Sequence, residues 1–180
     1  ELDPCVFTRG SGETLAIVLV YVDDGKAFSR DMKQLQLLQR QISATYEATF
    51  DFDPRAQYLG MIFDFSKEGE CKVSMPKLID DVLVEMDVTG TSKMPHGADL
   101  YDVDTESPAL DPIRAKKFYS VVYKLYYAAI RVEVRIQVAI HFLTTRVTKS
   151  TEEDWRKLMK VLQFLNGTER SELLLKPDDG

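Results

Sequence analysis

Short apolar runs in the first half of the chain indicate β-strands. Residues 6–9 and 15–22 are two such runs, rich in β-branched side chains and separated by a glycine-rich turn. A shorter run at 26–28 predicts a third, weaker strand, which would complete a small antiparallel sheet. Residues 57–65 and 71–75 flank a second glycine-containing turn, so they predict one strand each and together a further hairpin.

Apolar residues at helical spacing predict four helices. Residues 31–47 form an amphipathic pattern with Ser29 as the N-cap, and a second stripe runs from Pro76 towards Gly90. Residues 114–129 are nearly apolar all round, which is typical of a buried helix.

The last helix has the clearest boundaries. Thr151 and the acidic residues after it form an N-terminal cap, apolar residues follow on one face, and Asn166-Gly167 supplies the stop. Leu173-Leu174-Leu175 predicts a short terminal strand, and residues 177–180 resemble a connection to a further segment.

The segment 130–142 fits two periods at once. Its apolar residues alternate strictly with polar or small ones, which favours a strand, yet Ile136, Ala139, Ile140 and Leu143 also fit a helix. Periodicity alone therefore favours a strand here.

Prolines and acidic residues concentrate between the two helical regions. Residues 88–113 include Pro95, Pro108 and Pro112, which predicts a linker. Residues 1–113 carry 10 Lys and Arg against 21 Asp and Glu, whereas residues 114–160 carry 11 against 4. The basic stretch could contact phosphates while the acidic half holds metal, or each stretch could be a solvated helix face.

The overall composition limits these interpretations. With 180 residues, 44% hydrophobic and 29% charged, the chain can bury a core as one domain or two small subdomains. A net charge of −6 disfavours a simple nucleic-acid binder. Cys5 and Cys71 lack metal-ligand spacing, so we expect two reduced core thiols. No stretch predicts a signal peptide or a membrane span, so we expect a soluble protein in an intracellular setting.

Candidate chemistry lies where the second strand ends. The apolar run leads into Tyr21-Val22-Asp23-Asp24-Gly25, which places two carboxylates at the tip of a hairpin. Carboxylate oxygens suit Mg²⁺, and nucleotidyl transfer commonly uses a metal pair held by such groups. An ordinary hairpin with an acidic turn is the alternative, because Asp-Gly is a common turn dipeptide.

Several motifs in one order give the sequence a family resemblance. Tyr21-Val22-Asp23-Asp24, Tyr58-Leu59-Gly60 and Met94-Pro95 follow one another, and Phe118-Tyr119-Ser120 and Phe164-Leu165-Asn166-Gly167 continue the order. This series resembles the reverse transcriptase of copia-type LTR retrotransposons, over nearly the whole chain.

The resemblance implies an α+β fold: a partial antiparallel polymerase palm sheet with hairpins, followed by a helical thumb/connection region. Residues 1–75 would be part of the palm, with the YVDD hairpin and a primer-grip-like hairpin. Residues 76–113 would be a helix and an acidic linker, and residues 114–180 the thumb/connection region leading toward an RNase H domain. Residues 134–146 would then be a helix, which overrides the alternation, although Val134 stands where the family usually has part of a Pro-Asp pair.

The same resemblance assigns roles to individual residues. Asp23 would be the ligand shared by two Mg²⁺ ions, with Mn²⁺ as a possible substitute, and Asp24 would be auxiliary. Tyr21 and Val22 would line the nucleotide and primer end, and Tyr58, Leu59 and Gly60 would hold the primer strand. Basic residues of the second half would contact the nucleic-acid backbone: Lys116, Lys117, Lys124, Arg131, Arg135 and Arg146.

The resemblance also implies what the chain would need. The partners would be an RNA template, a DNA primer, deoxynucleotides and the rest of a polyprotein, in a cytoplasmic virus-like particle and without a membrane. An upstream palm strand would supply another catalytic aspartate and cover the strand at 15–20. We therefore expect an exposed apolar sheet edge and no polymerisation by this chain alone. The alternatives are a degenerate remnant that folds without chemistry and, more distantly, an independent paired-aspartate phosphotransferase.

Overall fold

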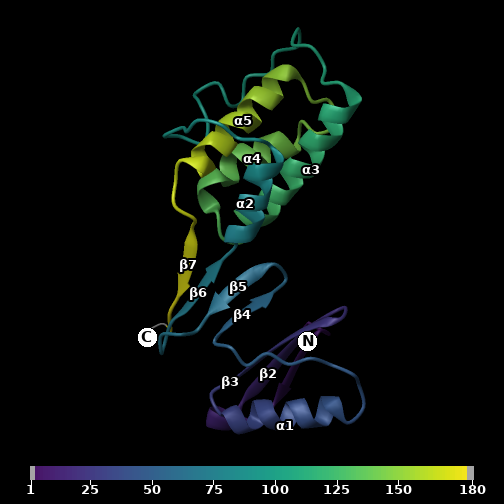
Figure 1. Ribbon diagram of the computed structural model, residues 1–180, viewed down its shortest axis with the longest axis vertical. Coiled ribbons are helices and arrows are strands. Elements are labelled where there is room, and N and C mark those ends of the chain that lie inside the picture. The colour runs from purple at the N-terminus through teal and green to yellow at the C-terminus, as the bar shows by residue number, and fades with distance from the viewer. Residues whose placement is uncertain (1–2, 178–180) are drawn as a thin grey trace. The chain divides into compact units, whose positions relative to one another are not determined.

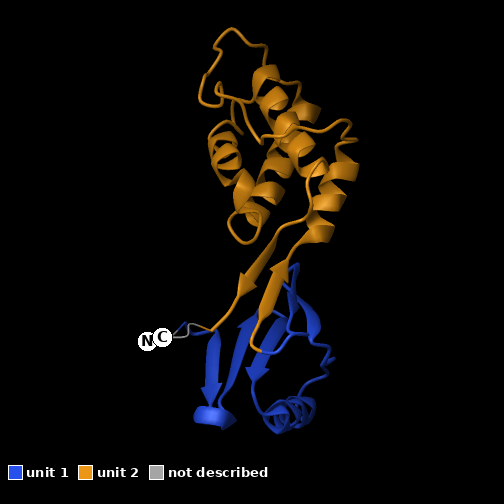
Figure 2. Cartoon of the chain, turned by 90° about the vertical axis from the view of Figure 1, so that its left-hand side faces the viewer, with its two compact units in different colours: residues 1–68 blue, residues 69–180 orange. Residues whose placement is uncertain are grey.

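The computed structural model describes residues 3–177 and has the predicted α+β class. The chain divides into two compact units, unit 1 (Glu1–Glu68) and unit 2 (Gly69–Gly180), which are coloured separately in Figure 2. Unit 1 holds five of the strands and one α-helix of the described residues, and unit 2 holds the other two strands and four α-helices.

A three-stranded antiparallel sheet forms the first part of unit 1. Its strands are β1 (Val6–Arg9), β2 (Ala16–Tyr21) and β3 (Asp24–Ser29), in the order β1-β2-β3. All three predicted strands are confirmed, and β3 is longer than expected because it pairs with β2 as far as Asp24 opposite Tyr21. The expectation of an edge at 15–20 is wrong, since β2 is the central strand.

Helix α1 (Met32–Ser43) confirms the amphipathic helix but not its cap. The Asp31 carboxylate accepts a hydrogen bond from the Lys33 backbone N–H at 3.0 Å and so caps the helix. Ser29, the predicted N-cap, belongs to β3, and its hydroxyl donates to the Leu15 carbonyl at 2.9 Å. The cap prediction was wrong because strand pairing extends through Ser29.

The predicted single strand at 57–65 is wrong. It is divided by a tight turn into β4 (Arg55–Tyr58) and β5 (Met61–Asp64), which pair antiparallel. Leu59 and Gly60 form the turn with φ of 49° and 73°. This left-handed conformation costs glycine little, and it reverses the chain within an otherwise apolar run.

Unit 1 buries few apolar side chains. Among its described residues, the buried hydrophobic ones are Ala16 and Ala56, whereas Phe7 and Tyr21 are 57% and 58% exposed. Other apolar side chains of the unit, such as Ile17 and Phe28, are half-buried, so its fully buried core is smaller than that of unit 2.

Unit 2 combines a strand pair with four helices. β6 (Cys71–Ser74) pairs antiparallel with β7 (Glu172–Leu175), which confirms the predicted terminal strand. Figure 1 shows the four helices packed against one another. They are α2 (Pro76–Glu85), α3 (Pro112–Ala129), α4 (Gln137–Thr144) and α5 (Glu152–Asn166).

The strand favoured by the alternation of residues 130–142 is wrong, because residues 130–133 form a turn and the chain is helical from Val134 onward. This confirms the helix that the resemblance implies. A short 3₁₀ turn, Val134–Ile136, leads into α4. Ile136 and Ile140 are fully buried, whereas Val134 and Val138 are 62% and 53% exposed. Alternation would have buried all four, so packing of one helical face against the core decided the conformation.

The core of unit 2 is large and apolar. Its fully buried large side chains come from all four helices and the 3₁₀ turn: Val82, Phe118, Val121, Val122, Leu125, Ile136, Ile140, Leu143, Leu158, Val161, Leu162 and Leu165. The segment 88–113 contains no helix or strand before α3, apart from one bridge between Ala109 and Thr151. It nevertheless packs within this unit, because Pro95, Leu100 and Leu110 are buried.

Cys71 is buried, whereas Cys5 is exposed. The expectation of a core position for Cys5 was wrong, because its place just before the short edge strand β1 leaves it exposed. Among residues 3–177 no helix is long and apolar enough to cross a membrane. Residues 178–180, which formed most of the predicted terminal connection, lie outside the described residues.

Candidate functional site

The acidic pair lies at the tip of the β2–β3 hairpin. Tyr21 and Asp24 are directly opposite each other, so Val22 and Asp23 form a two-residue turn. Asp24 is the first residue of β3, and both carboxylates are exposed to solvent. The hairpin therefore presents two adjacent oxygen-rich side chains outward, where a hard cation can reach them.

Val22 gives this turn an unusual backbone. Its φ is 57°, in the left-handed region that β-branched residues avoid, and its side chain is 86% exposed. No burial of the side chain offsets the strain of this conformation. Strained residues of this kind cluster at functional sites, where they hold a loop in one arrangement.

Tyr58 lies close to the acidic turn. Burial raises the pKa of its hydroxyl above the ordinary value, and the negative charge of Asp24 raises this pKa further, with smaller effects from Cys5 and Tyr21. The fold of unit 1 thus brings Tyr21, Asp24 and Tyr58 close enough to interact. Leu59 and Gly60 form the turn that follows Tyr58, so they lie in the adjacent hairpin rather than in a strand.

Cys5 is the residue near this site that the sequence interpretation missed. The Val20 backbone N–H donates to the Cys5 carbonyl at 2.9 Å, which places Cys5 beside the end of β2. The position of Cys5 could have been predicted from the strand pairing. Val6 pairs with Leu19, so extending this antiparallel pairing by one residue places Cys5 opposite Val20.

The acidic pair is not part of a larger ligand cluster within residues 3–177. No group of three or more His, Cys, Asp or Glu side chains there could hold a metal ion. Asp23 and Asp24 could supply oxygen ligands to one ion, and water or other groups would fill the remaining positions.

The six basic residues predicted to contact nucleic acid all belong to unit 2, and five of them have partners within the protein. Lys117 Nζ donates to the Glu85 carbonyl at 2.8 Å, and Lys124 Nζ lies 2.6 Å from Oε2 of the same residue. The Arg131 guanidinium stacks on Tyr127, 3.6 Å from the ring centroid.

The remaining two arginines bind buried carboxylates. Arg135 donates to both oxygens of Glu133, which is 3% exposed, and this pairing raises the pKa of Arg135. Arg146 Nε donates to Asp154 at 3.1 Å. Lys116 is exposed and has no hydrogen bond or ion pair within residues 3–177. Of the six, Lys116 is therefore the most available to a phosphate.

No protein-family model matches the chain, and no solved structure matches it.

Proposed function

We propose that this chain contributes part of the polymerase site of a copia-type reverse transcriptase. The observation that carries the proposal is the strained β2–β3 turn, which holds Asp23 and Asp24 at a solvent-exposed hairpin tip with Tyr58 close by. An ordinary acidic turn has no need of a β-branched residue with positive φ at its first position.

In this proposal the acidic pair holds divalent metal. Asp23 is the ligand shared by two Mg²⁺ ions and Asp24 assists it, because carboxylate oxygens are the preferred ligands of this ion. Bound ions of this kind stabilise the negative charge on the attacking and leaving oxygens of nucleotidyl transfer. Two ions would need carboxylates besides this pair, since no larger group of ligating side chains occurs within residues 3–177.

The aromatic and glycine residues around the pair bind substrates. Tyr21 and Val22 line the nucleotide and the primer end, and Tyr58, Leu59 and Gly60 hold the primer strand. The Tyr58 hydroxyl suits this role, since a protonated phenol can donate a hydrogen bond to a phosphate or sugar oxygen. Basic residues of unit 2, Lys116 first among them, contact the backbone of the RNA template and the DNA primer.

Primer extension by the complete reading frame that contains this chain tests the proposal. Asp23→Asn should reduce nucleotide incorporation by at least about 100-fold, because it removes charge from the metal ligand that both ions share. Asp24→Asn should reduce it less. Asp53→Asn is the matched control, since Asp53 is an exposed carboxylate of unit 1 outside the acidic turn. Its carboxylate accepts a hydrogen bond from the Arg55 backbone N–H at 2.8 Å.

Full activity in both turn variants would refute the assignment. The coding sequence upstream of Glu1 gives a second test. An open frame with a further palm aspartate supports the proposal, whereas stop codons there support the alternative, a degenerate remnant that folds without catalysis.

A further inference from the structure

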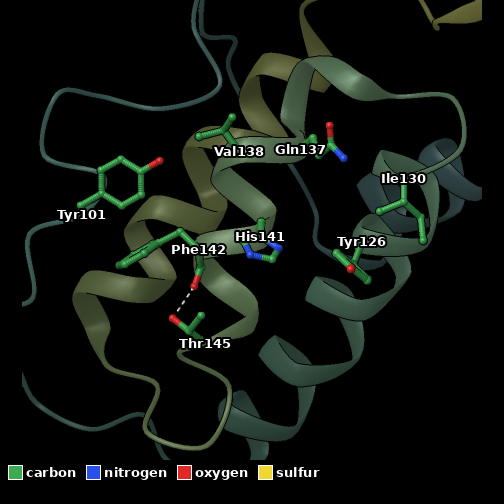
Figure 3. A pocket seen from close by; sticks show the side chains of 8 residues that line it. All are labelled: Tyr101, Tyr126, Ile130, Gln137, Val138, His141, Phe142 and Thr145. Carbon is green, nitrogen blue, oxygen red and sulfur yellow. Dashed lines mark hydrogen bonds between the residues drawn. The ribbon is translucent and has the colours of Figure 1, made fainter.

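Unit 2 contains a pocket of about 430 Å³, a size typical of small-molecule sites. Helix α4 supplies four lining residues from one face and α3 supplies one, the residues just after these two helices supply one each, and the segment before α3 supplies one (Figure 3). The lining residues are Tyr101, Tyr126, Ile130, Gln137, Val138, His141, Phe142 and Thr145.

Aromatic rings lie on both sides of this pocket. Tyr101 meets Phe142 edge to face, with 5.5 Å between ring centroids, and Tyr126 meets His141 at 6.4 Å. Tyr101 is 65% exposed, so much of its ring is free to contact a ligand. Rings on two sides of a pocket favour a planar aromatic ligand, because such a ligand can stack on a ring face or meet a ring edge.

Four lining side chains also offer unused hydrogen-bonding groups. The hydroxyls of Tyr101 and Tyr126, the amide of Gln137 and the imidazole of His141 have no hydrogen-bond partner within residues 3–177. Thr145 differs, since its hydroxyl donates to the Phe142 carbonyl at 2.7 Å. A hydrocarbon ring would displace the water bound to these four groups without forming hydrogen bonds with them. Leaving these polar groups without partners is unfavourable.

The pocket carries no fixed charge. None of its eight lining residues is Asp, Glu, Lys or Arg, so the part of the ligand that enters is uncharged.

We propose that this pocket binds the base of a nucleotide. A nucleobase is planar, uncharged and edged with both donors and acceptors, which matches the aromatic rings and the unused polar groups of the lining. The source of the base is either a free nucleotide or a single-stranded nucleic acid. This inference stands on unit 2 alone and does not depend on the acidic turn.

Calorimetric titration of the full chain with AMP, ribose 5-phosphate and a short single-stranded oligo(dA) tests the inference. AMP or the oligonucleotide should bind, and ribose 5-phosphate, which lacks the base, should bind at least tenfold more weakly. The tighter of the first two identifies the source of the base. Gln137→Leu and His141→Phe keep the size of each side chain and should each weaken binding by about threefold to tenfold.

Val138→Trp provides an independent variant, because Val138 is 53% exposed and a larger side chain there fills the pocket without entering the core. It should abolish base binding while the far-ultraviolet circular dichroism stays unchanged. Tyr119→Ala is the matched control, since Tyr119 is an exposed ring of α3 outside the pocket. The inference is overturned if neither AMP nor the oligonucleotide binds, or if ribose 5-phosphate binds as well as AMP. It is also overturned if the pocket variants bind like the unaltered chain.

Discussion

Val22 adopts a backbone conformation that its side chain disfavours. The strain in the acidic turn can therefore be tested without measuring catalysis. With φ of 57° and 86% of the side chain exposed, Val22 gains nothing from packing that would offset the strain. Val22→Gly should therefore stabilise the hairpin by about 1 kcal/mol, measured by hydrogen exchange of the β2 and β3 amides.

Val20→Gly serves as the control for this substitution. Val20 lies within β2, where a glycine lowers stability because it is more flexible when unfolded and has no side chain to pack. Slower exchange in both variants, or faster exchange in Val22→Gly, would show that the turn is not strained.

The proximity of Tyr58 to Asp24 can be tested by titration. Asp24→Asn should lower the pKa of Tyr58 towards its ordinary value, because the carboxylate charge disfavours the tyrosinate. Burial, the larger cause, remains. Asp23→Asn should have a smaller effect, since Asp24 is the carboxylate whose charge acts on Tyr58. Tyrosinate absorbance, with Tyr58→Phe to identify the signal, measures this pKa, and a response to Asp23 alone would contradict the arrangement.

The raised pKa of Tyr58 also determines how this residue makes stability depend on pH. The folded-state pKa of Tyr58 is raised above its unfolded value, so its contribution to stability is fully present below the unfolded value, near 10. That contribution is lost as the pH rises through the folded pKa.

The first turn of α5 contains one buried carboxylate, Asp154, and one exposed carboxylate, Glu152. Asp154, 2% exposed, accepts from the Thr151 N–H at 3.0 Å and from Arg146, whereas Glu152 pairs with Arg114 at the surface. Asp154→Ala should cost about 3–5 kcal/mol because Arg146 loses its buried partner. Glu152→Ala should cost at most about 1 kcal/mol.

Thermal unfolding of both variants measures this difference. Equal losses would contradict the assignment of Asp154 as the residue that holds the start of α5.

The elements show what local sequence can and cannot predict. β2 and α5 were correctly predicted, because a β-branched run and a capped amphipathic stripe each indicate one structure. The β4–β5 turn was missed, because Leu59 carries no turn signal and takes φ of 49° only with Gly60 beside it. The spacing of apolar residues in α4 fits both a helix and a strand. Which of the two forms depends on which side chains pack against the core, and local sequence does not show this.

The candidate site was predicted in part for the same reasons. The sequence located the acidic turn, because a strand that runs into Asp-Asp-Gly has few alternatives. It did not predict that the charge of Asp24 acts on Tyr58, because that proximity depends on tertiary packing within unit 1. Arg135 and Arg146 had been assigned to nucleic acid, but sequence alone could not show that Glu133 and Asp154 would bind them.

At the scale of the whole molecule, the basic residues of unit 2 predict a salt-dependent association with an RNA–DNA duplex. Binding should weaken steeply with salt and show little sequence preference, because phosphates dominate the contacts. Replacing Lys116, Lys117 and Lys124 with Ala should flatten the logarithmic salt slope, with Lys116 contributing about one unit.

Lys77→Ala is the matched control, since Lys77 is an exposed lysine of α2 that pairs with Asp81. An unchanged slope in the triple variant would remove those three lysines from the interface.

Metal binding by the β2–β3 turn, as we propose it, can be measured with paramagnetic Mn²⁺. Adding Mn²⁺ to the isotope-labelled chain should broaden the amide NMR signals of residues 21–25 before any others. We expect one weakly bound Mn²⁺ ion, which added Mg²⁺ displaces. Asp23→Asn should abolish this selective broadening, and Asp53→Asn should leave it unchanged. Broadening that spreads evenly over all exposed carboxylates, or that survives Asp23→Asn, would contradict the claim.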